Sequence, residues 1–288
     1  MNLPRSGCWD ATCDSRTGRS SVTVPSALAT RLEKTAVDNG FDQELLRQDD
    51  WLAFASSQVP LRIWLTASAD GRILCAFSQQ HVASAMSDYG KAVDMSLPPP
   101  AVAVRSVADI PDLHHLLRRA FQLSRALPDE LLRAFQKQIV GLPRATEVER
   151  LVLQRVGQDI FRSGLLDYWE GRCAITGLAV PELLRASHIK PWAACASDAE
   201  RLDVFNGLLL APNLDAGFDC GFITVSEHGD VVVSEQLGES HRQLLGVDLP
   251  LRLSSLAVQH QAYLRFHRER VFKGPSSQSL PREVSKRL

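Results

Sequence analysis

The segment 172–226 constrains the fold most, because it spaces three chemically distinctive side chains between short apolar runs. His188 ends a short run, Asn206 opens the run Asn-Gly-Leu-Leu-Leu, and Asp215 lies within Asn-Leu-Asp-Ala-Gly-Phe-Asp. Eight residues separate Asn206 from Asp215, which is enough for one short strand and the first turn of a helix. We therefore expect a strand, a loop, a second strand and a helix, folded around one metal ion.

Four short motifs follow one another in this segment: Cys-Ala-Ile-Thr-Gly, Ala-Ser-His-Ile-Lys-Pro-Trp, Asn-Gly-Leu-Leu-Leu and Leu-Asp-x-x-Phe-Asp-x-Gly-x-Ile. Their order is more specific than any one motif, and it resembles the HNH endonuclease family, the ββα-metal nucleases, in particular restriction-type proteins of bacteria. The resemblance continues to 263–272 and covers roughly the C-terminal half, whereas we recognise no family in the N-terminal half. It implies metal-dependent hydrolysis of phosphodiester bonds in DNA, in restriction or phage defence.

The resemblance and the chemistry of each residue type together assign roles to four side chains. His188 is the candidate general base, because an imidazole with an ordinary pKa of about 6.5 can accept a proton at cellular pH. Asn206, the second member of the catalytic pair, is expected to hold the loop that carries the base. Asp215 is the first metal ligand. Asp219 lies one helical turn later on the same face, and it is either a second ligand or a brace for the turn at Gly221.

The carboxylate at position 215, where many HNH proteins carry His, favours Mg²⁺ or Mn²⁺ as the divalent cofactor. Ser187 stands where many relatives place an Asp or His ligand, so water and phosphate would complete the coordination shell. The chain has no Cys-x-x-Cys pair, and we therefore do not expect the structural zinc that many HNH proteins bind.

A surface for nucleic acid must be a local patch, because the formal net charge of the whole chain is only −1. Residues 251–288 carry eight basic residues against two acidic ones, a balance that favours binding to a phosphate backbone. We assign substrate binding to Arg265, Arg268 and Arg270, and also to Lys190 beside the base. An ordinary exposed lysine is the alternative for Lys190, and a plain solvated tail is the alternative for the last residues.

The predicted fold class is α+β, with a small N-terminal α+β unit, a helical connector and a C-terminal ββα-metal nuclease domain. The expected boundaries are a disordered tail at 1–21, a recognition or regulatory unit at 22–105, the connector at 106–168, the nuclease domain at 169–273 and a basic tail at 274–288.

Within the N-terminal half, hydrophobic periodicity predicts a helix over 25–47 and helices over 110–140 and 145–168. Strands are expected at 51–55, 61–66 and 73–77, followed by an extended proline-rich linker at 97–103. The alternation along the strands favours core positions for Trp51 and Trp64 over a platform for stacking bases.

No apolar run is long enough to span a bilayer, and the N-terminus lacks the apolar core of a signal peptide, so we expect a cytoplasmic protein without a membrane partner. Two alternatives to a DNA nuclease stay open. One is a nucleic-acid-binding or regulatory protein whose HNH scaffold no longer cuts, and the other is a nuclease that cuts RNA. Because one site cuts one strand at a time, double-strand cleavage would need a homodimer or two successive nicks.

Overall fold

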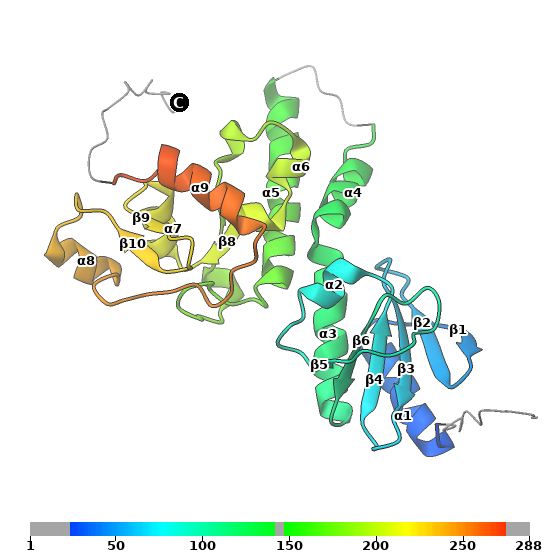
Figure 1. The fold of residues 1–288 in the computed structure, drawn as a ribbon. Helices are drawn as coiled ribbons and strands as arrows, with labels where there is room; N and C mark the ends of the chain where they lie inside the picture. Colours follow the sequence, from blue (N-terminus) through cyan, green and yellow to red (C-terminus); the bar gives the residue numbers. More distant parts are fainter. Residues whose placement is uncertain (1–23, 142–146, 275–288) are drawn as a thin grey trace, which may run out of the picture.

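A computed structural model of the chain describes residues 24–141 and 147–274 (Figure 1). The protein is α+β, as predicted: an N-terminal unit built on one sheet and a C-terminal module built on a short hairpin meet along the long helix α5, Glu147–Tyr168. The predicted tail at 1–21, and all of the predicted basic tail except Gly274, lie outside the described residues. Within the described ranges, no helix combines the length and the apolar character that crossing a membrane requires.

The N-terminal unit is organised around an antiparallel sheet with the strand order β1-β2-β3-β4-β6-β5. The predicted strands at 51–55 and 73–77 are confirmed, and the strand predicted at 61–66 begins and ends one residue later. The strands are β1 Gln43–Gln48, β2 Trp51–Ala55, β3 Arg62–Ala67, β4 Ile73–Phe77, β5 Lys91–Ala92 and β6 Ala103–Val107.

Three helices supply side chains to the main core of this unit: α1 Ser26–Asp38, α2 Gln80–Ser84 and α3 Ile110–Ala126. The predicted apolar stripe of α3 is buried with the sheet, because Leu113, Leu116 and Leu117 belong to the same core as the strands. The expected boundary at 105 therefore cuts through β6, and α3 belongs to the core of the N-terminal unit. A second, smaller apolar cluster contains Trp51 and Trp64, which are core residues and offer no stacking platform.

Two predictions about this unit are wrong in part. The helix expected over 25–47 ends at Asp38, and the apolar Leu45 belongs to strand β1 instead. The chain turns at Gly40, whose φ is +89° and whose position would bring a Cβ within 2.6 Å of the Phe121 ring, so only glycine suits this turn. The extended linker expected at 97–103 ends one residue early, because Ala103 already pairs in β6.

Helix α4, Pro128–Gln138, and helix α5 connect the two parts of the molecule. The helix predicted over 110–140 is broken at Leu127, since Pro128 starts a new helix. The helix predicted over 145–168 is observed from Glu147, and its proposed cap Thr146 lies outside the described residues.

Two arginines of α3 tie the N-terminal unit to the end of α5. Arg119 is 9% exposed and donates hydrogen bonds to the backbone carbonyls of Asp167 and Tyr168. Arg125 makes a bidentate ion pair with the Asp167 carboxylate, with both N–O distances at 2.6 Å. Both guanidiniums are therefore engaged in contacts within the fold.

The C-terminal module contains the predicted succession of strand, loop, strand and helix. Its first part comprises η1 Pro181–Leu183, β7 Arg185–His188, η2 Trp192–Ala194, α6 Asp198–Arg201, η3 Val204–Asn206, β8 Gly207–Leu210 and α7 Pro212–Asp219. A second hairpin and two helices follow, namely β9 Ile223–Val225, β10 Val231–Val233, α8 Glu239–Leu245 and α9 His260–Arg270. Helix α9 contacts β9 and η3 and so packs across the module.

Candidate active site

The hairpin β7–β8 and helix α7 form one compact unit. The strands pair antiparallel in a register that places His188 opposite Gly207. Pro212 begins α7, where a proline sacrifices no intrahelical hydrogen bond. The apolar side of α7, formed by Leu214 and Phe218, is buried in the core. This packing fixes the polar side of the helix beside β7.

Asp215 and Asp219 lie one turn apart on α7, and Ser187 of β7 reaches them. The Ser187 hydroxyl donates a hydrogen bond to Asp219 Oδ1 at 3.2 Å. Partial burial raises the pKa of Asp215, while the Ser187 hydroxyl and the charge of Arg185 oppose that rise. Desolvation also raises the pKa of Asp219, and the negative charge of Asp215 raises it further. Two like charges held this close favour a cation beside them.

The chemistry of these donors fits a hard divalent cation. Carboxylate oxygens are the protein ligands that Mg²⁺ prefers, and this ion keeps several of its waters. Within residues 24–141 and 147–274, no three His, Cys, Asp or Glu side chains gather as a metal site. Asp215 and Asp219 would therefore hold such an ion together with water, and Ser187 would steady Asp219.

The His188 ring is held in a defined orientation by the loop and by α5. Its Nε2 lies 2.9 Å from the backbone carbonyl of Arg201. Because a carbonyl can only accept, Nε2 carries the proton of the neutral ring and Nδ1 keeps its lone pair. Burial lowers the pKa of His188 to about 4, so the ring is neutral at pH 7. Among the described residues Nδ1 has no hydrogen-bond partner, which leaves it as a proton acceptor.

The structure does not bring His188 into contact with the carboxylates. Neighbouring strand residues point to opposite faces, and accordingly Ser187 faces Asp219 whereas the His188 ring stacks on Phe161 of α5. The sequence led us to expect an imidazole and a carboxylate converging around one cation. The described contacts show instead that they flank the end of β7 from two sides, with separate partners.

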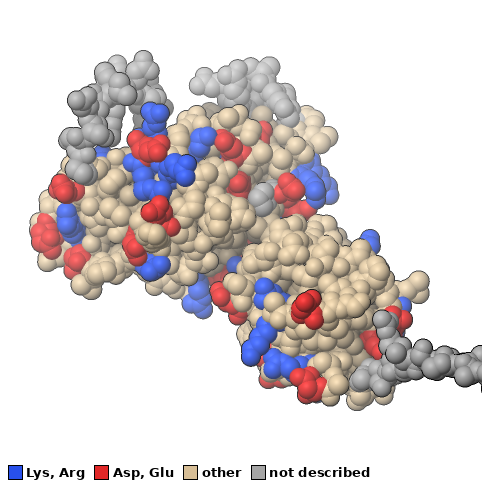
Figure 2. Space-filling view, in the orientation of Figure 1, with Lys and Arg blue, Asp and Glu red and all other residues tan. Residues whose placement is uncertain are grey.

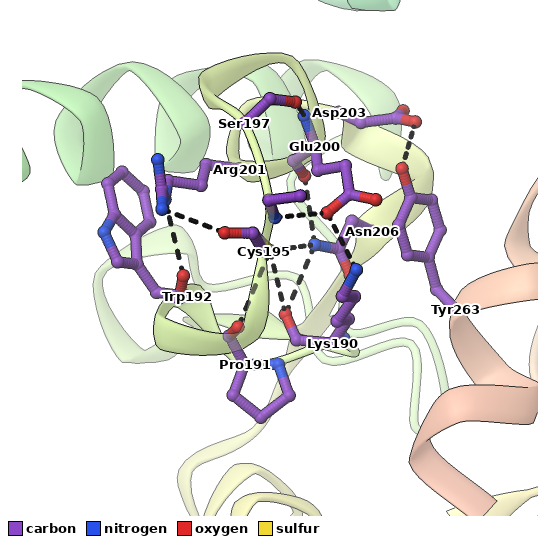
Figure 3. A network of polar contacts seen from close by, with 11 residues as sticks. Lys190, Pro191, Trp192, Cys195, Ser197, Glu200, Arg201, Asp203, Asn206 and Tyr263 are labelled. Carbon is purple, nitrogen blue, oxygen red and sulfur yellow. Dashed lines mark hydrogen bonds and ion pairs between the residues drawn. The ribbon is translucent and has the colours of Figure 1, made fainter.

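Asn206 is completely buried and spans the loop that follows β7 (Figure 3). Its Oδ1 accepts a hydrogen bond from the backbone N–H of Lys190 at 2.7 Å, and its Nδ2 donates to the carbonyl of Glu200 at 3.0 Å. These bonds hold the loop just before Arg201, whose carbonyl binds His188. The amide thus acts on the base through the backbone, in the bracing position expected from the sequence.

Lys190 is engaged inside the same loop. Its Nζ lies 2.8 Å from Glu200 Oε2, and only 17% of its side chain is exposed. The Lys190 hydrogen bond is the largest cause of the lowered pKa of Glu200. Because Glu200 neutralises this ammonium, the structure shows Lys190 as a brace of the loop, and its assignment to the phosphate stays a prediction.

The three arginines assigned to substrate binding all lie on α9, and they differ in exposure. Arg265 and Arg270 are exposed, whereas Arg268 donates a hydrogen bond to the backbone carbonyl of Val225 at 2.9 Å. Figure 2 shows Lys and Arg side chains gathered where α9 lies, with acidic residues among them. Arg265 and Arg270 are therefore the arginines of this group that remain open to a ligand.

Sequence reasoning missed two contributors to the site. Glu200 pairs with Lys190. The Ser-x-x-Glu pattern of a capping box marks Glu200 as a residue of a helix start, where Ser197 accepts a hydrogen bond from the Glu200 N–H, but that pattern does not show the pairing with Lys190. Phe161 forms one wall around His188. It gave no signal, since one aromatic residue in a long amphipathic helix is an ordinary core residue.

Residues 173–226 match the family model described as HNH endonuclease. These residues form an HNH endonuclease domain. The matched segment includes β7, β8 and α7, and thus the hairpin, the loop and the two carboxylates described above. An HNH domain suggests nuclease activity on nucleic acid, and HNH nucleases generally use a divalent metal. No curated protein matches the chain significantly.

Helices α5 and α9 lie outside the HNH match. The wall that α5 places against His188 is therefore a feature of this chain that the match does not cover. The same holds for the basic helix, so the resemblance expected at 263–272 stays a prediction.

Proposed function

We propose that the protein is a metal-dependent endonuclease that hydrolyses phosphodiester bonds in DNA and serves in restriction or phage defence. The observation that carries this proposal is the oriented, neutral His188 ring at the end of β7, beside the Asp215 and Asp219 pair, within an HNH domain. A proton acceptor and a cation-binding pair at one strand end are the two requirements for activating water against a phosphate.

In this proposal His188 takes a proton from the attacking water at Nδ1, while Arg201 keeps the ring in place through its carbonyl. Asn206 holds the loop that carries this carbonyl. Asp215 and Asp219 hold the ion, either Mg²⁺ or Mn²⁺. When bound, such an ion supplies charge neutralisation at the scissile phosphate and at the leaving oxygen.

The exposed Arg265 and Arg270 support a nucleic-acid substrate, because they supply positive charge on the same module as the site. Among nucleic acids we propose DNA on the family resemblance, and RNA is an outcome of the test. The N-terminal unit, which lies outside the HNH match, would recognise a feature of the target or a partner. A homodimer would place two such sites on opposite strands.

One observation favours the second candidate function, a protein that binds nucleic acid without cutting it. Ser187 of β7, whose hydroxyl faces the carboxylates of α7, is a weak metal donor. Under that function, DNA binding would depend strongly on salt, and uptake of Mn²⁺ would not depend on Asp215.

The test is cleavage of supercoiled plasmid in Mg²⁺ or Mn²⁺ by the wild type, His188→Ala and Asp215→Asn, with His241→Ala as the control at an exposed histidine of α8. We expect nicking by the wild type and by the control only. Equal nicking by His188→Ala would refute the assignment of the base. Cleavage of RNA alone would replace the substrate, and binding without cleavage of either would favour the second candidate.

A further inference from the structure

We propose that Phe161 is a positioning residue which, together with Trp192, clamps the His188 ring so that Nε2 stays on the Arg201 carbonyl and Nδ1 stays open. We call Phe161 and Trp192 the aromatic clamp. The proposal rests on the proposed function for its effect on cleavage, but the clamp itself is a property of the folded chain.

The two rings meet His188 from different elements and at different angles. The Phe161 ring of α5 is stacked on the imidazole, with a centroid distance of 3.8 Å and an interplanar angle of 15°. The Trp192 ring of η2 stands nearly perpendicular to it, at 5.5 Å and 89°. Stacked and edge contacts between aromatic rings stabilise the pair beyond the burial of apolar area. One wall therefore fixes the plane of the ring, and the other limits its movement along that plane.

Two glycines provide the space that the clamp occupies. A Cβ at Gly207, opposite His188 in the hairpin, would lie 2.5 Å from the tip of the Phe161 ring. A Cβ at Gly157 of α5 would lie 2.6 Å from the Trp192 ring. Glycine inside a helix is less favourable than alanine. The close approach of Trp192 gives a packing reason for this cost.

The loop supports the Trp192 wall from outside. The guanidinium of Arg201 lies 5.7 Å from the Trp192 ring centroid, and its Nη2 donates to the carbonyl of Cys195 at 2.9 Å. The residue whose carbonyl binds His188 thus also holds the second wall, as Figure 3 shows for Arg201 and Trp192. The Trp192 contact and the hydrogen bond are coupled through one residue, because the Arg201 side chain holds Trp192 and the Arg201 carbonyl binds His188. Loosening the ring should therefore loosen the bond.

The test compares Phe161→Leu with Leu165→Val in the full chain. Leu165 is fully buried on the same helix and packs, like Phe161, at Gly207, so its truncation controls for weakened packing. The first readout is the ring N–H resonance of His188 in the metal-free protein, followed by NMR and assigned by its loss in His188→Ala. The second is plasmid cleavage, with kcat and KM measured separately.

We expect the His188 N–H to be protected from exchange with water in the wild type and in Leu165→Val, and to broaden or vanish in Phe161→Leu. We expect kcat of Phe161→Leu to fall about tenfold, part of the range that a general base contributes, with KM unchanged. A protected N–H in Phe161→Leu, or a kcat equal to that of Leu165→Val, would overturn the proposal.

Trp192→Leu removes the other wall and decides the question if Phe161→Leu does not fold: loss of the protected N–H supports the clamp, and retention overturns it. If the wild type cuts no nucleic acid, the proposed function fails, while the N–H resonance still decides whether the clamp exists.

Discussion

Two histidines of the C-terminal module are stacked on phenylalanine in nearly the same way, yet their ring nitrogens make different hydrogen bonds. His188 lies 3.8 Å from Phe161 at 15°, and His267 of α9 lies 3.8 Å from Phe218 at 12°. Burial lowers the pKa of each to about 4. Stacking and burial alone therefore make a neutral imidazole, and they do not distinguish a base from a core residue.

The difference lies in the ring nitrogens. His267 uses both, with Nδ1 at 2.9 Å from the Thr224 hydroxyl and Nε2 at 3.1 Å from the Phe218 carbonyl. His188 uses Nε2 on the Arg201 carbonyl, and its Nδ1 has no partner among the described residues. A neutral ring can act as a base only where one nitrogen keeps a free lone pair. The comparison predicts that His188 acts as a base on the substrate, whereas His267 stabilises the fold.

The largest expected effect separates the two histidines by substitution. His188→Ala should lower plasmid cleavage by about 10²–10⁴-fold, the usual contribution of a general base, and it should lower the thermal midpoint less than His267→Ala, because His188 makes one hydrogen bond and His267 makes two. His267→Ala should lower the midpoint, because each lost buried hydrogen bond costs about 1–3 kcal/mol, and its folded fraction should still cleave. Cleavage assays and thermal unfolding on both variants measure this. Loss of stability in His188→Ala together with loss of cleavage in His267→Ala would contradict the roles assigned to these two histidines.

A second prediction separates the surroundings of the two stacks through their glycines. Gly157→Ala pushes a Cβ against Trp192 at 2.6 Å, and it should destabilise the fold by about 1–3 kcal/mol and slow cleavage. Gly217→Ala, beside Phe218, meets only the Leu245 side chain at 3.1 Å, and the better helix propensity of alanine, about 1 kcal/mol, should offset that contact. Urea unfolding of both variants is the measurement. Equal losses would show that the space around Trp192 is not special.

The third prediction concerns pH and treats the two histidines alike. Burial lowers the folded pKa values of both to about 4, below the ordinary histidine pKa of about 6.5. The stability that each neutral ring contributes is therefore fully present above about pH 6.5, and it is lost as the pH falls toward 4. Removing either ring should lower the slope of unfolding free energy against pH in this window by up to one proton, about 1.4 kcal/mol per pH unit. Chemical unfolding between pH 4 and 7 measures the slope, and an unchanged slope in His188→Gln would show that this ring titrates normally.

The smallest expected effects distinguish cations inside the loop from cations on α9. Arg265→Ala should weaken DNA binding a few-fold and reduce its salt dependence by about one phosphate contact. Lys190→Ala removes a brace that is already paired with Glu200, so it should alter kcat more than binding. Fluorescence anisotropy at several salt concentrations measures the binding. If the salt dependence of DNA binding changes only in Lys190→Ala, then Lys190 and not Arg265 contacts the phosphate backbone.

The parts of the fold that were predictable are those where local pattern and tertiary burial agree. The strands at 51–55 and 73–77 and the ββα succession after Cys173 fall in this group, because turn residues and apolar runs delimit them. The helix predicted beyond Asp38 failed because helical periodicity alone cannot show that the chain reverses at Gly40 and pairs Leu45 in an edge strand. Nor can periodicity show which partner an amphipathic helix will cover, and α3 was therefore taken for a connector.

The candidate site divides in the same manner. Asp215 and Asp219 are neighbours for a local reason, their spacing on one helix, and Asn206 makes hydrogen bonds within the loop after β7 that the sequence led us to expect it to hold. The pairing of Lys190 with Glu200 and the stacking of Phe161 on His188 depend on how the loop and α5 pack, which no local pattern encodes. The opposite facing of Ser187 and His188 follows from strand geometry once β7 is known to continue through both.

The central claim is that His188 of β7 and the carboxylates of α7 act on one phosphate, although His188 and Ser187, which contacts Asp219, face opposite sides of β7. Cleavage rates of His188→Ala, Asp215→Asn and the double variant test it directly, because residues that act as a unit show strongly non-additive losses. We predict that the cleavage rate of the double variant lies within about tenfold of the rate of the less active single variant. Losses that multiply, or wild-type cleavage by either single variant, would contradict the claim.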